Sequence, residues 1–169
     1  MNDVKIIFCG LSKNCGKTLV KNIEFIDKFI KFYNDVDIRS IIVESDSIDG
    51  SLDYLKNLQS SSQIELFIEN GLEQSIPSRI ERIAICRNIG LDYIKNNFSD
   101  LKNLIYIPYD NDIDLFENIS ENNFMSLIEN LISNRDIRGI FPISEPFYYD
   151  IFALRAKGWI DYNAQKIAG

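Results

Sequence analysis

The chain has 169 residues, of which 46% are hydrophobic and 25% charged, and its formal net charge is −7. This length and composition predict a single globular domain, 1–169, that buries a core. The acidic balance argues against a nucleic-acid partner, because neutralising phosphates requires clustered Lys and Arg. We find neither an apolar run of about 18 residues, as a membrane span requires, nor a secretory signal, so we expect a cytoplasmic protein.

The elements predicted along the chain alternate between strands and helices. Buried apolar runs mark the strands, and apolar residues at helical spacing mark the helices. The predicted strands are 4–10, 37–45, 63–70, 101–110, 137–144 and 147–155. The predicted helices are 15–33, a short one within 47–58, 78–98, and one that Ser120 caps and that ends near 133. This alternation predicts an α/β sandwich with a mainly parallel central sheet.

The three cysteines, Cys9, Cys15 and Cys86, include no C-x-x-C pair, and the chain has no histidine. Such cysteines are typical of buried free thiols in a reducing compartment. Without histidine, a histidine-based catalytic triad or zinc site is excluded. Any metal is therefore expected to bind oxygen ligands, as Mg²⁺, Mn²⁺ and Ca²⁺ do.

Polar clusters at 10–14, 44–49 and 109–114 follow three of the predicted strands. Because ligands of parallel α/β sheets bind at the carboxyl ends of the strands, we expect the three clusters to meet at one edge. That edge is the predicted binding site.

The segment "FCGLSKNCGKTL" (8–19) is close to a phosphate-binding P-loop but departs from it. The P-loop pattern has four residues between its first glycine and Gly-Lys-Ser/Thr. Here five residues separate Gly10 from Gly16, and Leu11 stands where the turn needs a glycine. We therefore predict an ordinary helix start at this point. A P-loop NTPase or kinase stays open as an alternative, with Asp110 at a strand end to hold Mg²⁺.

Four segments in order resemble one family. "IIVESDSIDGSLDYL" (41–55) is similar to the strand-end motif of GT-A glycosyltransferases. "RIERIAICRNIGLDYIK" (79–95) and "FYYDIFALR" (147–155) resemble segments of GT-A-like proteins related to the cryptococcal capsule mannosyltransferases, and 8–19 resembles their opening strand and turn. The resemblance covers almost the whole chain. It implies a GT-A-like, Rossmann-like three-layer sandwich and a nucleotide-sugar-dependent glycosyltransferase.

The resemblance implies that residues near the strand ends bind the nucleotide sugar. Gly10 and Leu11 would lie against the nucleotide. Glu44 and Asp46 would hold the ribose or the base, since a carboxylate accepts both vicinal hydroxyl hydrogens of a ribose. The alternative is a local turn or cap, in which Asp46 or Asp49 accepts hydrogen bonds from backbone N–H groups.

Basic and amide side chains are the implied phosphate ligands. Arg87, with Asn88, would reach the diphosphate, where a planar guanidinium makes bidentate contacts. Arg79 lies eight residues earlier, near the same helical face. Lys13 would meet a phosphate. The alternatives are a solvent-exposed lysine and ion pairs of the arginines with neighbouring glutamates.

Acidic residues supply the implied metal site and the implied base. Asp110 and Asp112 form a D-x-D pair that would hold Mn²⁺ or Mg²⁺ on the donor diphosphate. The alternative is a solvated acidic turn. Asp150 would act as general base on an acceptor hydroxyl, or else would form a structural ion pair with Arg155.

Three functions are therefore open. The first is a glycosyltransferase, or its donor-binding domain, acting in polysaccharide or glycoconjugate assembly on a nucleotide sugar and a glycan acceptor. The second is the P-loop NTPase or kinase. The third is a non-catalytic interaction domain that retains the fold and contacts a partner through aromatic residues around 147–152. Since the chain is short for a complete glycosyltransferase, we expect further domains or partner proteins.

Overall fold

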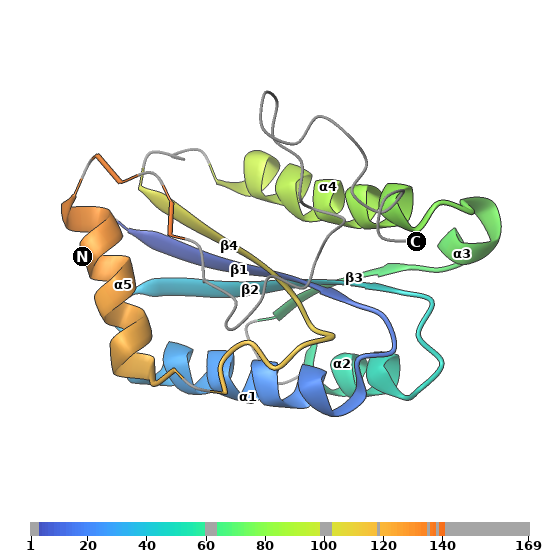
Figure 1. Ribbon diagram of the computed structural model, residues 1–169, viewed down its shortest axis with the longest axis horizontal. Coiled ribbons are helices and arrows are strands. Elements are labelled where there is room, and N and C mark those ends of the chain that lie inside the picture. Colours follow the sequence, from blue (N-terminus) through green and yellow to red (C-terminus); the bar gives the residue numbers. More distant parts are fainter. Residues whose placement is uncertain are drawn as a thin grey trace, which may run out of the picture. The chain divides into compact units, whose positions relative to one another are not determined.

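The computed structural model describes residues 4–59, 64–98, 103–117, 119–134, 136–137 and 139–140. The chain divides into two compact units, Met1–Phe124 and Met125–Gly169. The first unit is an α/β sandwich whose central sheet is four-stranded and wholly parallel (Figure 1). Within the described residues, no helix combines the length and the apolar character that crossing a membrane requires.

Strands and helices alternate along the first unit, as predicted. The strands are β1 (Lys5–Ser12), β2 (Asp37–Ser45), β3 (Ile64–Glu69) and β4 (Leu104–Asp110). The helices are α1 (Gly16–Phe32), α2 (Ser51–Gln59), α3 (Leu72–Ser75), α4 (Arg79–Asn97) and α5 (Glu121–Ser133), the last of which begins in the first unit.

Three details compare the observed elements with the sequence prediction. The one-turn helix α3 was not predicted. The predicted cap of α5 is confirmed, because the N–H of Asn123 donates to Ser120 Oγ at 3.2 Å. The strands predicted at 137–144 and 147–155 lie outside the described residues, except for 137 and 139–140, which are not in a strand.

The strand order is β3-β2-β1-β4. The chain passes from β1 through β2 to β3 on one side, and then returns to place β4 on the other side of β1. The register pairs Ser12 with Glu44 and Leu11 with Asp110, so the strands end at a common edge. This order puts the topological switch point between β1 and β4, where open α/β sheets bind their ligands.

Helices cover both faces of the sheet. α4 lies on one face, and α1 and α2 lie on the other (Figure 1). Successive side chains of each strand alternate between the two faces. The core beneath α4 consists of Ile7, Cys9, Ile41, Ile94 and Phe98. The core beneath α1 and α2 includes Cys15, Leu19, Ile23, Ile42 and Leu55.

The three cysteines are buried and unpaired, which confirms the prediction of free thiols. Burial raises the pKa of each thiol. Cys86 also belongs to the buried row of α4, with Gly90 and Ile94. At Gly90 the helix comes so near to β1 that an added Cβ would lie 2.4 Å from Cys9 Sγ. α4 is therefore held tightly against the central strand.

Candidate functional site

The candidate site is the carboxyl edge of the sheet, where the three predicted polar clusters meet. Its loops divide into two groups. One group follows β1, β2 and β3, and its members are tied to one another by hydrogen bonds. The other is the region between β1 and β4, at the switch point. We call them the tied half and the switch-point half.

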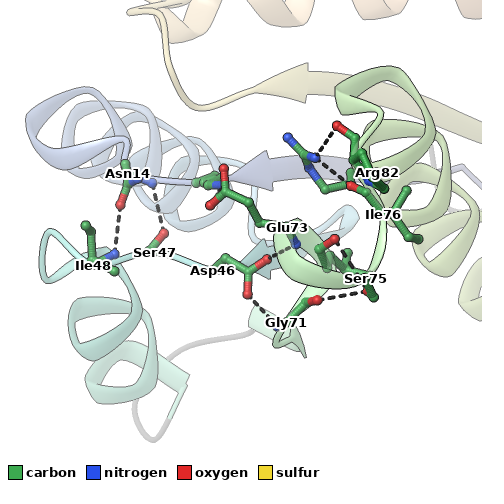
Figure 2. A network of polar contacts seen from close by, with 12 residues as sticks. Asn14, Asp46, Ser47, Ile48, Gly71, Glu73, Ser75, Ile76 and Arg82 are labelled. Carbon is green, nitrogen blue, oxygen red and sulfur yellow. Dashed lines mark hydrogen bonds and ion pairs between the residues drawn. The ribbon is translucent and has the colours of Figure 1, made fainter.

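In the tied half, Asn14 joins the loop after β1 to the loop after β2. Its N–H donates to Ser47 Oγ at 2.9 Å, and its side-chain Oδ1 accepts from the N–H of Ile48 at 2.8 Å (Figure 2). Asn14 has a positive φ of 52°, a conformation that asparagine tolerates better than most residues. Asn14 thus links the two loops through hydrogen bonds.

Asp46 joins the loop after β2 to the loop after β3. Its carboxylate accepts from the N–H of Gly71 at 2.5 Å and from that of Glu73 at 2.8 Å, at the start of α3 (Figure 2). The N–H of Glu73, together with that of Gly71, holds the pKa of Asp46 below its usual value. The predicted alternative, a carboxylate bonded to backbone N–H groups, is therefore confirmed for Asp46. It holds for Asp49 too, which accepts from the N–H of Ser51 at 3.0 Å.

Lys13 also faces this half of the edge. Its Nζ lies 2.8 Å from Glu73 Oε2 in an ion pair. The structure therefore gives the predicted phosphate ligand an acidic partner within the chain.

The backbone N–H groups of the loop from β1 to α1 donate hydrogen bonds to other groups of the chain. The N–H of Lys13 donates to Cys15 Sγ at 3.3 Å, and that of Gly16 donates to Ser51 Oγ at 3.1 Å. The N–H of Asn14 is bonded to Ser47, as described above. A P-loop points such groups at the phosphates instead. The hydroxyl of Thr18, at the position that would bind Mg²⁺, lies 2.6 Å from the carbonyl oxygen of Cys15. These contacts favour the ordinary helix start.

Glu44 is fully buried at the end of β2. Its Oε1 accepts from the N–H of Ser47 at 2.8 Å, whereas its Oε2 has no hydrogen-bond partner among the described residues. It shares a face with Ile42, towards α1 and α2, and its neighbour across the ladder is the buried Ser12. A buried carboxylate oxygen without a partner is costly, so it marks a place for a ligand hydroxyl or an ordered water.

In the switch-point half, the loop after β4 is fixed to α1 and to β1 by two fully buried asparagines, Asn22 and Asn111. The Nδ2 of Asn22 donates to the carbonyl of Ile113 at 2.8 Å, and its Oδ1 accepts from the N–H of Leu115 at 3.2 Å. The N–H and the Nδ2 of Asn111 both donate to the carbonyl of Leu11, at 3.0 and 3.1 Å. The base of this half is therefore rigid.

Above that base, Arg87 of α4 meets Asp110 at the end of β4. Nη2 of Arg87 lies 3.4 and 3.2 Å from the two carboxylate oxygens of Asp110. The two side chains are 49% and 46% exposed, so solvent reaches both partners. The structure thus joins a predicted diphosphate ligand to a predicted metal ligand.

The acidic residues after β4 do not fit a preformed divalent-cation site. Asp110 already faces the positive charge of Arg87, and Asp112 is exposed. Asp114 pairs with Lys21 at 2.6 Å. Among the described residues there is no group of three His, Cys, Asp or Glu side chains that would hold a metal ion.

Gly10 has a role in packing that the sequence did not suggest. The ring of Tyr109 lies across it, and an added Cβ would be 2.4 Å from Tyr109 Cζ. Burial raises the pKa of the Tyr109 phenol. The space over this face of Gly10, predicted for the nucleotide, is thus filled by the chain's own aromatic ring. Leu11, the next residue, ends beside Asp110 at the switch point.

The remaining predicted site residues are not drawn into these contacts. Arg79 and Asn88 are exposed on α4 and form no side-chain hydrogen bond or ion pair with the described residues. Asp150, the predicted base, lies outside the described residues, as does its alternative partner Arg155.

Sequence reasoning missed Asn22 and Asn111. One signal was available for Asn22, because it interrupts the apolar stripe of α1 beside Leu19, Ile23 and Ile26. A polar residue in a buried stripe predicts a buried hydrogen-bond partner. No comparable signal marks Asn111, which follows Tyr109 and Asp110 in a polar turn.

Comparison with known protein families and with curated proteins finds no match for this chain.

Proposed function

We propose that this chain binds a nucleotide sugar at the carboxyl edge of its sheet and is the donor-binding domain of a glycosyltransferase with the GT-A fold. The observation that carries the proposal is the convergence at the β1–β4 switch point. Leu11 from β1, Arg87 from α4 and Asp110 from β4 meet there. Switch points of doubly wound parallel sheets are the usual binding crevices for nucleotides.

Glu44 supports the same proposal from the tied half. β2 and β4 flank β1, so the backbones of Glu44 and Asp110 are two strand spacings apart, about 10 Å, and their side chains leave the edge on opposite faces of the sheet. A nucleoside diphosphate extends over such a distance. Its diphosphate would face Arg87, and its ribose hydroxyls would donate to the unpartnered Oε2 of Glu44 once a shift of the loop after β2 exposes that oxygen, which is buried in this structure.

Sugar transfer itself rests on the resemblance of four segments to the GT-A-like family. Under that resemblance Asp150 takes the proton from the acceptor hydroxyl. The acceptor is a glycan, and the side that binds it belongs to residues beyond Asp110 or to a partner protein.

The test is calorimetric titration of the 169-residue protein with UDP, GDP, CDP and ATP. We expect one nucleoside diphosphate to bind. Glu44→Gln, which keeps the shape and removes the charge, should weaken that binding about tenfold, the effect of one hydrogen bond to a charged group. Lys17→Ala is the control and should bind as the unaltered protein does, since Lys17 is exposed on α1.

Two results would reject the proposal. ATP binding that disappears in Lys17→Ala would favour a P-loop function, although the N–H groups of this loop are hydrogen-bonded within the chain. Absence of binding to all four nucleotides would favour an interaction domain that retains the fold.

A further inference from the structure

The ion pair between Arg87 and Asp110 has the properties of an exchangeable contact. It lies at the switch point, and both side chains are about half exposed. An exposed ion pair contributes little to stability, because water and salt screen its charges. A ligand that displaces one partner therefore loses little free energy in doing so.

The backbone position of Arg87 is fixed by the packing of α4. Arg87 stands between Cys86 and Gly90 on α4, and these two residues face the sheet while Arg87 faces solvent. The close packing of Gly90 on Cys9 fixes the helix against β1 at this point. A guanidinium on a fixed helix binds the oxygens of a diphosphate with two parallel hydrogen bonds.

A divalent cation at the same place would meet an existing positive charge. Any cation that Asp110 coordinates must displace Arg87 or lie beside it, and like charges at that separation repel. The neighbouring Asp114 is likewise paired with a cation, Lys21. The charge that a metal would supply to the diphosphate is thus already present as a side chain.

We propose that Arg87 takes the place of the metal ion in donor binding, and that Asp110 is the internal anion that Arg87 exchanges for the diphosphate. This inference rests on the proposed function for its ligand, the diphosphate of a nucleotide sugar. In the free protein, Asp110 holds the guanidinium at the edge of the sheet. In the bound protein, the phosphate oxygens replace the carboxylate.

The decisive variant is Asp110→Asn, because the two roles of Asp110 predict opposite signs. As a competing anion, its loss frees Arg87, so a nucleoside diphosphate should bind about two- to fivefold more tightly, the size set by an exposed ion pair. As a metal ligand, its loss should weaken binding. Arg87→Gln should weaken binding about tenfold or more.

The matched controls lie at the opposite end of β2, where Arg39 and Asp37 form an ion pair of similar exposure and Lys5 is a second partner of Asp37. Asp37→Asn and Arg39→Gln remove the same charges far from the site and should leave binding unchanged. All variants are titrated by calorimetry with UDP, GDP and CDP and with inorganic pyrophosphate, in EDTA and in Mn²⁺.

The probes separate this inference from the proposed function. Tighter binding by Asp110→Asn, equal in EDTA and in Mn²⁺, supports both. Binding that requires Mn²⁺ and is weakened by Asp110→Asn overturns the inference and leaves the nucleotide-sugar function standing. Pyrophosphate binding that depends on Arg87, without binding of any nucleotide, supports the exchange and rejects the function. The inference is overturned if neither pyrophosphate nor any nucleotide binds. It is also overturned if both bind and Arg87→Gln changes the affinity of neither.

Discussion

The two halves of the carboxyl edge are held together in different ways. In the tied half, Asn14 and Asp46 join three loops through hydrogen bonds to backbone N–H groups. In the switch-point half, the base is equally fixed by Asn111, but the outermost contact is the exposed ion pair of Arg87 and Asp110. The first arrangement leaves few free donors, whereas the second leaves charged groups that solvent already reaches.

This difference indicates where a ligand binds with the least disruption. A ligand at the tied half must break several hydrogen bonds, most of them exposed, and each is worth about 0.5–1.5 kcal/mol. A ligand at the switch-point half replaces one exposed ion pair, worth about 0–1 kcal/mol. The tied half therefore acts as a frame, and the switch-point half as the place of exchange.

The largest expected effect comes from removing the fixed base of the switch-point half. Asn22→Ala leaves the carbonyl of Ile113 and the N–H of Leu115 without their partner. The free energy of unfolding should fall by about 3 kcal/mol, because the Asn22 side chain is fully buried and both of these hydrogen bonds are lost with it. Urea unfolding followed by circular dichroism measures it.

Asn96→Ala, an exposed position on α4, is the control and should change little. An equally small change in Asn22→Ala would mean that the loop after β4 is not anchored through Asn22. The comparison between a rigid base and an exchangeable surface would then fail.

Asn22 also illustrates how far the sequence leads. The apolar periodicity of 15–33 predicted α1 within one residue at each end, because spacing alone reports a buried helical stripe. The partner of Asn22 could not be predicted, since Ile113 lies 91 residues away and only the pairing of β1 with β4 brings it near.

For the site residues too, features set by the local sequence were predictable, and contacts between distant segments were not. The strand ends were predictable, and with them the common edge, because each buried apolar run ends in a polar cluster. The hydrogen bonds of Asp46 and the ion pair of Arg87 with Asp110 were not predictable, since both depend on where distant segments meet. For Asp46 the local alternative was foreseen, but not that its N–H partners come from the loop after β3.

The second largest effect concerns the strand that both halves share. In Gly10→Ala the new methyl group would lie against the ring of Tyr109. Overpacking of this kind lowers stability by about 2 kcal/mol, through displacement of the ring or of β1. Thermal or urea unfolding of Gly10→Ala reports it.

Tyr109→Ala provides the test of cause. If the steric contact is responsible, Gly10→Ala should cost less in the Tyr109→Ala background than alone, and the double-mutant cycle gives the difference. Equal costs in both backgrounds would assign the effect of Gly10 to something other than the ring.

A smaller effect is expected at the frame. Asp46→Ala removes the acceptor for two N–H groups and places alanine at a φ of 55°, whereas Asp46→Gly removes only the acceptor. We expect a loss of about 1 kcal/mol in the glycine variant, typical of a lost helix cap, and a larger loss in the alanine variant. Chemical unfolding of the two variants separates the loss of the two hydrogen bonds from the backbone strain of alanine at this φ.

Asp46 also makes a prediction about pH. Because the folded pKa lies below the value of about 3.9 in the unfolded chain, its contribution to stability is present above that pH and is lost as pH falls through the folded pKa. Asp46→Asn should therefore flatten the acid limb of the stability curve below about pH 4. An unchanged acid limb would show that the carboxylate is not held by those N–H groups.

The smallest effect is expected at the ion pair between Lys13 and Glu73, which lies in the same half as Asp46 but is more exposed. Glu73 keeps its backbone bond to Asp46 when its side chain changes, so Glu73→Gln removes the charge and leaves the frame in place. The urea midpoint should stay unchanged at physiological salt, because an exposed pair is screened there. A clear fall in the midpoint would mean that charges, and not backbone hydrogen bonds, hold the tied half together. The two halves would then differ only in how many ion pairs each contains, and the argument that places exchange at Arg87 would lose its physical basis.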